Sequence, residues 1–260
     1  MRALIGVFLA FLLGAALPAA AASPFTDPTG DSAGPDVAAV TVSNDAKELK
    51  VEVAFANRTA FVTGDVVLVD LDLDGNEKTG EEGIDLYAVL EGGEEPAVFV
   101  WKDGNFGESA DAKAAYGSAT ATLTVPLDLV IGVVGISVLA VGGPDPDVSP
   151  ADRAPDAGSW MYTVKAPALQ KGNVRFRPPR PRVGKLFAVA SVTLSFELIG
   201  AVEPKTVVCR ARLGRVALKQ ANVCAWKLPR NARGKTLTVS IEARYGGSAY
   251  TLPTARFKVR

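Results

Sequence analysis

Histidine is absent from this sequence of 260 residues, which contains only two cysteines and two methionines. Without His, a Ser-His-Asp or Cys-His catalytic set, a His-ligated zinc ion and a His-ligated haem are excluded. Two cysteines are too few for a Cys₄ zinc site or an iron–sulfur cluster. We therefore expect no haem and no zinc, and we predict that the chain is not an enzyme.

The first 22 residues have the pattern of a secretory signal peptide. Arg2 forms a positively charged N-terminal region, residues 4–13 form an apolar run, and Ala20–Ala22 before Ser23 make a cleavage site of small residues. The run is short for a bilayer span, and Pro18 also argues against a membrane anchor. We expect a mature chain that starts at Ser23, has no transmembrane span, and is secreted to the extracellular space or cell envelope.

Acidic and basic residues are segregated along the chain, although they balance overall. Residues 23–165 contain 25 acidic and 8 basic residues, whereas residues 166–260 contain 3 acidic and 19 basic residues. A reversal of charge at one position indicates a domain boundary. We predict an acidic domain over 23–165, a linker over 166–172 and a basic domain over 173–260.

Both halves alternate apolar and polar residues with the period of a β-strand. Runs of this kind occupy residues 37–42, 49–55, 66–73, 85–90, 97–101, 119–125 and 135–141, and again 189–198, 207–213, 223–228, 237–245 and 250–259. The apolar stretch 123–143 contains Pro126, Asp128 and four glycines, which favours two buried strands over a membrane span. The fold class is predicted as all-β: two antiparallel β-sandwiches, the first like a jelly roll and the second immunoglobulin-like.

Both cysteines lie in the basic half. An exported chain with an even number of cysteines usually pairs them, so we expect a Cys209–Cys224 disulfide between neighbouring strands. The spacing differs from the wide inter-sheet arrangement of antibody domains, and Trp226 follows the second cysteine.

A loop in the acidic half matches the calcium-binding pattern D-x-[DN]-x-[DN]-G-x₅-E from Asp70 to Glu81. Calcium takes six to eight oxygen ligands, and carboxylates at alternate positions of a tight loop can converge on one ion. The flanking sequences are strand-like, so we expect the loop to join two strands. The predicted ligands are Asp70, Asp72, Asp74, Asn76, Glu81, Glu82 and Asp85.

A solvated acidic strand edge would give the same alternation, and this alternative stays open. Within the predicted set, Asp72, Asp74 and Asn76 are the safer ligands, because Asp70 points away if the strand continues through Asp72. A second oxygen site is a further hypothesis at Asp27, Asp31 and Asp36, where Asp and Gly are also ordinary turn formers. A late loop contains four more aspartates, Asp145, Asp147, Asp152 and Asp156. They are weaker candidates for an oxygen site, because Pro and Asp are common in ordinary loops.

The acidic half resembles secreted bacterial β-sandwiches related to family-9-type carbohydrate-binding modules and DOMON domains. The resemblance covers residues 25–164 and is carried by the segments DPTGDSAGPDV, LDLDGNEKTG, GIDLYAVL, VWKDGNF and DAGSWMYTV. It implies a calcium-supported jelly roll that binds a sugar or haem, although haem does not suit a chain without His. The basic half is similar to bacterial immunoglobulin-like domains through CRARLGRVAL and NVCAWKLPRNARGKTL, which implies a fold and no activity.

Three functions follow as hypotheses. The first is a non-catalytic secreted or cell-surface binding or adhesion protein, whose basic half docks on an anionic envelope polymer through Arg210, Arg212, Arg215, Lys219, Arg230, Arg233 and Lys235. The second is a carbohydrate-binding module that holds an extracellular glycan on Trp101, Phe106 and Trp160. The third is a hydrolase with paired carboxylates, and here the sequence offers no constellation beyond the acidic loops. Export argues against a specific nucleic-acid partner.

Overall fold

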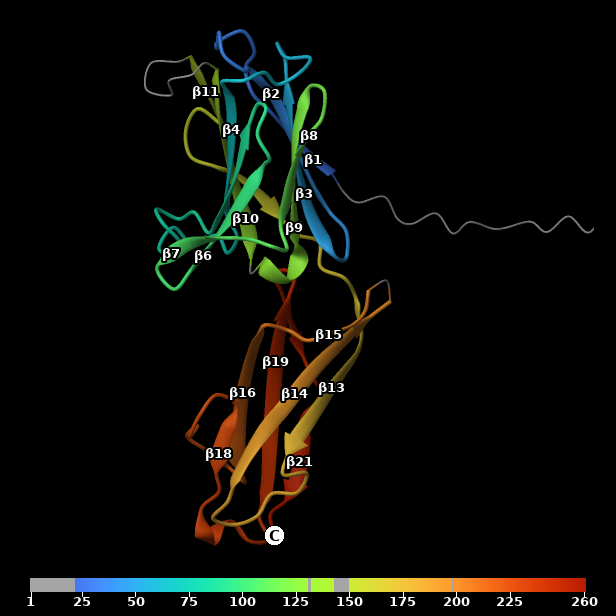
Figure 1. The fold of residues 1–260 in the computed structure, drawn as a ribbon. Coiled ribbons are helices and arrows are strands. Elements are labelled where there is room, and N and C mark those ends of the chain that lie inside the picture. Colours follow the sequence, from blue (N-terminus) through green and yellow to red (C-terminus); the bar gives the residue numbers. More distant parts are fainter. Residues whose placement is uncertain (1–21, 131, 143–149, 198) are drawn as a thin grey trace, which may run out of the picture.

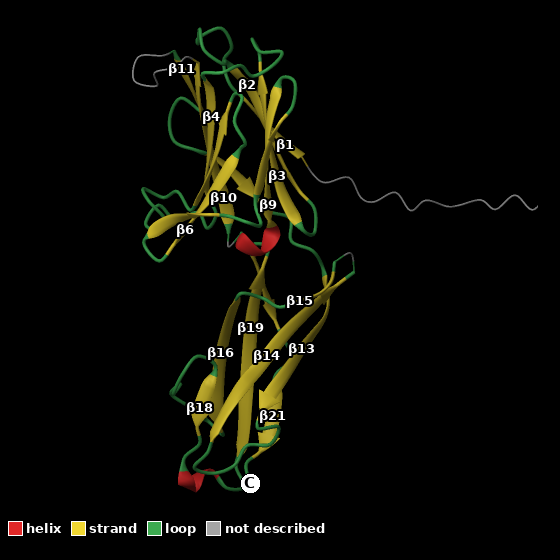
Figure 2. Ribbon diagram, in the orientation of Figure 1, coloured by secondary structure: helices red, strands yellow, loops and turns green. Residues whose placement is uncertain are grey.

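The structure, a computed structural model, describes residues 22–260 with the exception of 131, 143–149 and 198. In this part of the chain nearly every regular element is a β-strand, and the helices are two short 3₁₀ turns (Figure 2). The predicted all-β class is therefore confirmed. The predicted signal peptide, apart from Ala22, lies outside the described residues, as do Asp145 and Asp147.

Two antiparallel sheets form the first sandwich. One has the order β1 (Ala22–Thr26), β2 (Val37–Asn44), β3 (Glu48–Phe55), β9 (Thr120–Pro126), β8 (Lys113–Tyr116). The other has the order β11 (Ala151–Ala154), β10 (Val133–Gly142), β4 (Asp65–Asp72), β5 (Leu86–Glu91), β6 (Ala97–Lys102), β7 (Asn105–Glu108), and β12 (Trp160–Thr163) also pairs with β10.

Strand β4 illustrates how the sequence builds this sandwich. Val67, Val69 and Leu71 are buried, while the alternating Leu68 and Asp70 are only half-buried. Because successive side chains of a strand point to opposite faces, the first set fills the core and the second lines the outer face of the sheet. Each such buried aliphatic side chain contributes about 1.5–3 kcal/mol.

Two further sheets form the second sandwich. Strands β13 (Leu169–Arg177), β14 (Leu186–Phe196), β15 (Gly200–Val202) and β18 (Ala225–Lys227) make one, with β18 and β15 both on β14. The other contains β17 (Val216–Ala217), β16 (Thr206–Leu213), β19 (Thr236–Tyr245), β20 (Ser248–Thr251) and β21 (Ala255–Lys258). Strand β13 begins inside the predicted linker, because Leu169 already pairs with Phe196 of β14.

The disulfide joins Cys209 to Cys224, as predicted, but it crosses the sandwich rather than joining neighbouring strands of one sheet. Cys209 lies on β16, whereas Cys224 immediately precedes β18 in the opposite sheet. Both side chains are buried, and Trp226 beside them is fully buried. The bridge therefore fastens the two sheets of the second sandwich to each other.

The two sandwiches stack end to end, and the turn between β19 and β20 meets the first domain next to the 3₁₀ helix η1 (Leu127–Leu129) (Figure 1). The N–H of Gly247 donates to the carbonyl of Val130 at 3.0 Å, and Tyr245 Oη donates to the carbonyl of Ala46 at 3.2 Å. Lys205 Nζ forms an ion pair with Asp128 at 2.9 Å. The second 3₁₀ helix, η2 (Arg230–Ala232), lies at the far end of the second sandwich (Figure 2).

No helix in the described part of the chain has the length and apolar character needed to cross a membrane.

Candidate functional site

The predicted calcium loop connects β4 to β5, and it gathers three of the seven predicted ligands. Asp72, Asp74 and Asp85 each place a carboxylate oxygen within 4.8 Å of the others. Asp72 ends β4, Asp74 lies in the turn that follows, and Asp85 directly precedes β5. The loop thus returns on itself so that its two ends contribute to one acidic cluster.

Hydrogen bonds within the loop hold one oxygen of each of these carboxylates. Asp72 Oδ1 accepts from the N–H groups of Asp74, Gly75 and Asn76 at 2.7–3.2 Å. Asp74 Oδ1 accepts from the hydroxyl of Thr79 at 2.9 Å, and Asp85 Oδ2 accepts from the N–H of Leu73 at 2.9 Å. These hydrogen bonds orient three carboxylates toward one place, and such a donor set suits a hard cation such as calcium.

The environment of the cluster perturbs Asp85. Burial raises the pKa of Asp85 to about 6, and the neighbouring charges of Asp74 and Asp72 act in the same direction, against the hydrogen bond from Leu73. Like charges this close disfavour the ionised form unless a cation neutralises them.

Three of the other predicted ligands of this loop lie elsewhere. Asp70, Glu81 and Glu82 line a hollow on the outer face of the sheet rather than the cluster. Asn76 is exposed, and its side-chain oxygen accepts from the N–H of Lys78 at 3.3 Å. The first and last positions of the calcium pattern, Asp70 and Glu81, are thus separated from the acidic cluster between them.

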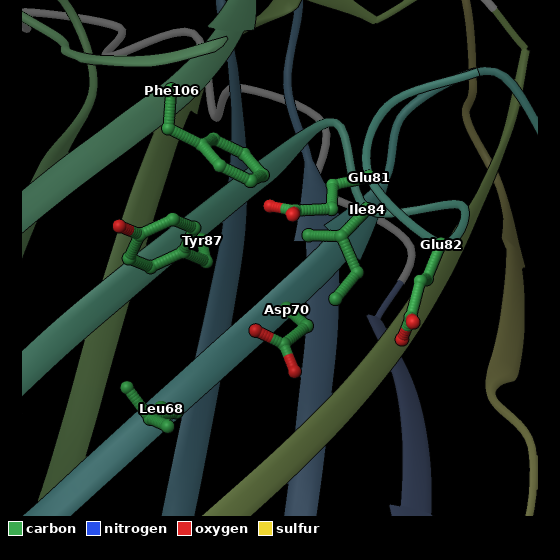
Figure 3. Close-up of a pocket in the computed structure, with 7 residues that line it drawn as sticks. All are labelled: Leu68, Asp70, Glu81, Glu82, Ile84, Tyr87 and Phe106. Carbon is green, nitrogen blue, oxygen red and sulfur yellow. The ribbon is translucent and has the colours of Figure 1, made fainter.

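This hollow has a volume of about 460 Å³ and is open to solvent. Leu68, Asp70 and Tyr87 of the sheet form part of its lining, and Phe106 approaches from β7 (Figure 3). The carboxylate of Glu81 projects toward the rings of Phe106 and Tyr87 in this view. The complete lining is Leu68, Asp70, Glu81, Glu82, Ile84, Tyr87 and Phe106.

Strand register explains why aromatic and acidic side chains meet here. Asp70 of β4 pairs with Tyr87 of β5, which pairs with Phe99 of β6, so the three side chains form one row on the outer face. The rings of Tyr87 and Phe99 stack at 4.9 Å between centroids. Phe106 packs edge-on against Tyr87 at 4.7 Å and against Trp101 at 4.9 Å, which extends the row into a four-ring aromatic group.

Partial burial in the hollow raises the pKa of Asp70, and the positive charge of Arg153 lowers it to a smaller extent. A carboxylate in this setting is a good hydrogen-bond acceptor with an incomplete water shell.

Trp160, the third predicted aromatic ligand, is not brought to the hollow. It pairs with the buried Ile136 of β10, so it lies on the core side of the sheet. Its ring stacks on Phe25 of the opposite sheet at 5.4 Å with an interplanar angle of 13°. The pair closes one edge of the first sandwich, which is a packing role.

The second predicted acidic site gathers residues from both ends of the first domain. Asp27, Asp31 and Asp152 place carboxylate oxygens within 4.8 Å of one another. Asp36 adjoins them, because its Oδ2 accepts from the N–H of Gly30 at 2.7 Å. Burial, and to a smaller extent the charges of four neighbouring aspartates, raise the pKa of Asp27 to about 6; these aspartates are Asp152, Asp156, Asp31 and Asp36.

The predicted basic residues are all exposed, but they are scattered over the second sandwich. Arg210 and Arg212 lie on the outer face of β16. Arg212 pairs with Thr238 of β19, and Thr238 pairs with Arg256 of β21, so these residues form a row across the sheet. The others lie in turns and in η2: Arg215, Lys219, Arg230, Arg233 and Lys235.

Tyr87, Phe99 and Asp152 are candidate site residues that the sequence analysis did not assign to a site. Tyr87 alternates with the buried Leu86 and Ala88, so the sequence pattern indicates that its side chain points to the outer face of the sheet. The pairing that places it beside Asp70 depends on register, which a single sequence does not give.

Comparisons with known proteins identify no family. No family model matches the chain, and no curated protein does. One similar solved structure is a chimeric titin Z1Z2-Z1Z2 tandem functionalized with a GRGDS exogenous peptide from fibronectin. It is 10% identical, covers 82% of this chain and 91% of its own, and has a TM-score of 0.24. A likeness of this size carries no argument about fold or function.

Proposed function

We propose that this chain is a non-catalytic extracellular binding protein whose first sandwich holds a glycan in the hollow beside β4, β5 and β7. The observation that carries the proposal is the placement of aromatic rings and carboxylates around one solvent-open concavity. The resemblance to carbohydrate-binding modules supports the same conclusion, and the disulfide suits an oxidising compartment.

The chemistry of the lining fits a sugar. A pyranose ring offers C–H groups that pack on an aromatic face, and hydroxyl groups that donate hydrogen bonds around its edge. Tyr87 and Phe106 provide the aromatic contact, and Asp70 beside Tyr87 provides an acceptor. The carboxylates of Asp70, Glu81 and Glu82 would repel an anionic polymer, which makes a neutral or basic glycan the better occupant of this hollow.

Calcium at the loop cluster is part of this proposal. Asp72, Asp74 and Asp85 would hold the ion with their second oxygens. The bound ion would supply positive charge and fix the loop. The same loop carries Glu81 and Glu82 to the hollow, so fixing it preorganises one wall of the binding site.

Affinity electrophoresis of the purified chain against a panel of polysaccharides tests the proposal. We expect retardation by at least one glycan, lost in Phe106→Ala and weakened in Asp70→Asn. The matched control is Phe25→Ala, which removes the same ring from the core side of the sandwich. Absence of retardation by every glycan would overturn the proposal, and release of shorter products from a retained glycan would overturn its non-catalytic part.

A second candidate function is docking of the basic sandwich on an anionic envelope polymer. The supporting observation is the row from Arg212 through Thr238 to Arg256, with Arg210 on the same face of β16. Retention on a heparin or wall-polymer column at modest salt should fall in Arg210→Glu/Arg212→Glu. The same charge change in Arg230→Glu/Arg233→Glu, at the far end of the domain, should leave most of the retention. Equal losses in the two variants would point to net charge rather than to a docking face.

A further inference from the structure

The second acidic cluster, around Asp27 and Asp152, lies at the end of the first sandwich that is opposite η1. It connects the two sheets of this sandwich. Asp27 follows β1 and Asp36 precedes β2, both in one sheet, whereas Asp152 lies on β11 in the other. Asp152 Oδ2 accepts from the N–H of Val37 at 2.6 Å, a hydrogen bond that crosses between the sheets. The cluster therefore lies where β1, β2 and β11 meet.

The carboxylates of this cluster are buried without a charge to balance them. Asp27, Asp36 and Asp152 are 9%, 3% and 5% exposed. Asp27 Oδ2 and Asp36 Oδ1 are buried and have no hydrogen-bond partner in the described structure. None of the ion pairs formed by the described residues includes these three side chains.

Another buried carboxylate of the same domain has both a charge partner and hydrogen-bond donors. Asp65, of similar burial, receives two hydrogen bonds from the guanidinium of Arg58, at 3.0 and 3.2 Å, and one from the N–H of Val62. An ionised carboxylate that is buried without such partners strongly destabilises the folded state. Three buried carboxylates lie at this place, and two of them have an oxygen without a partner among the described residues. This indicates that the partner is a cation that is not part of the chain.

We propose that Asp27, Asp31 and Asp152, with Asp36 beside them, form a calcium site that fastens the two sheets of the first sandwich. Calcium takes carboxylate oxygens at about 2.3–2.6 Å, so ligands on opposite sides of the ion lie up to roughly 5 Å apart. The mutual distances of up to 4.8 Å among Asp27, Asp31 and Asp152 fall within that span. Asp31 is exposed and lies at the entry of the site.

The ligand chemistry selects among metals. All four side chains offer hard oxygens, which suit calcium or magnesium, and no sulfur or imidazole is present to favour zinc. Magnesium demands a tighter octahedron at about 2.0–2.1 Å and retains its water, so a buried site of several carboxylates fits calcium better. This inference stands independently of the glycan proposal.

Isothermal titration of calcium into the EDTA-treated full chain tests the site, with Asp27→Asn/Asp152→Asn as the variant. The control is Asp72→Asn/Asp74→Asn in the β4–β5 loop, which makes the same change in the other acidic cluster. We expect the first variant to bind one calcium ion fewer than the wild type, and the control to retain that ion. Circular dichroism verifies that each variant is folded. The single variant Asp36→Asn is a milder substitution that should lower the affinity for the same calcium ion at least tenfold.

Thermal melts give an independent readout. The wild type should melt several degrees higher in calcium than in EDTA. Asp27→Asn/Asp152→Asn should lose the part of this rise that comes from the proposed site and keep only the part that comes from the β4–β5 loop. In EDTA that variant should be at least as stable as the wild type, because the substitution relieves carboxylate repulsion. Binding of the same number of calcium ions by the variant and the wild type would overturn the site. A wild type that responds to magnesium but not calcium would overturn the assignment to calcium.

Discussion

Removal of the Cys209–Cys224 bridge should destabilise the second sandwich and leave the first almost unchanged. The cysteines are 15 residues apart in sequence, and a loop of this length gives a chain-entropy contribution of about 3 kcal/mol. For a domain the size of the second sandwich, each kcal/mol lowers the melting temperature by roughly 4–8 °C, so a fall of roughly 12–24 °C is expected.

Differential scanning calorimetry of Cys209→Ala/Cys224→Ala measures this shift, provided that the two sandwiches give separate transitions. Reduction of the wild type with dithiothreitol is the matched control, since it opens the bridge without changing side-chain volume in the core. Both treatments should move the same transition by a similar amount. The reasoning would be refuted by an equal shift of both transitions, or by a fall of less than a few degrees in each.

Three further predictions concern stability and the domain junction. Arg58→Met should lower the free energy of unfolding of the first sandwich by about 3 kcal/mol in urea, because Asp65 is left buried without its ion-pair partner. Tyr116→Phe should be neutral or slightly stabilising, since it removes a buried hydroxyl that has no hydrogen-bond partner among the described residues. Burial, then two nearby carboxylates, raises the pKa of Tyr116 to about 12. The wild type, unlike this variant, should therefore lose stability as the pH rises from the ordinary tyrosine value toward 12. Gly247→Val should loosen the junction, because a Cβ at this positive φ would lie 2.9 Å from the carbonyl oxygen of Gly132. Small-angle scattering should show a wider range of domain orientations, and an unchanged profile would contradict it.

Much of the fold follows from alternation of apolar and polar residues. Twelve strands were predicted by their period, and the apolar stretch 123–143 is divided between β9 and β10 with η1 between them, as expected. Strands β1, β7, β8, β11, β12, β15 and β17 were missed because they are short and carry little periodic signal. The longer β13 was missed as well, and none of its residues is buried. The predicted strand 250–259 is two strands, β20 and β21, separated by a segment that contains Pro253.

The acidic sites show what a single sequence does not predict, namely which acidic residues come together in the fold. The EF-hand-like pattern assigned Asp70 and Glu81 to the metal. Asp70 lies in β4 on the same outer face as Asp72 but two residues earlier, so it lines the hollow instead of the cluster. Asp85 was a predicted ligand, and it joins the cluster because the loop closes on itself. Asp152 looked like part of a plain loop, and it reaches Asp27 only through pairing of β11 with β10. Local spacing predicts which residue types are available, whereas sheet register decides which of them meet.

The most direct test of the glycan proposal is a nuclear magnetic resonance titration of the ¹⁵N-labelled chain with soluble oligosaccharides in calcium. The account predicts that at least one oligosaccharide shifts the backbone amide signals of Asp70, Tyr87 and Phe106 in a saturable manner. Signals of the second sandwich should stay in place. Shifts confined to the second sandwich, or no shift with any oligosaccharide, would contradict the claim that this hollow is a glycan site.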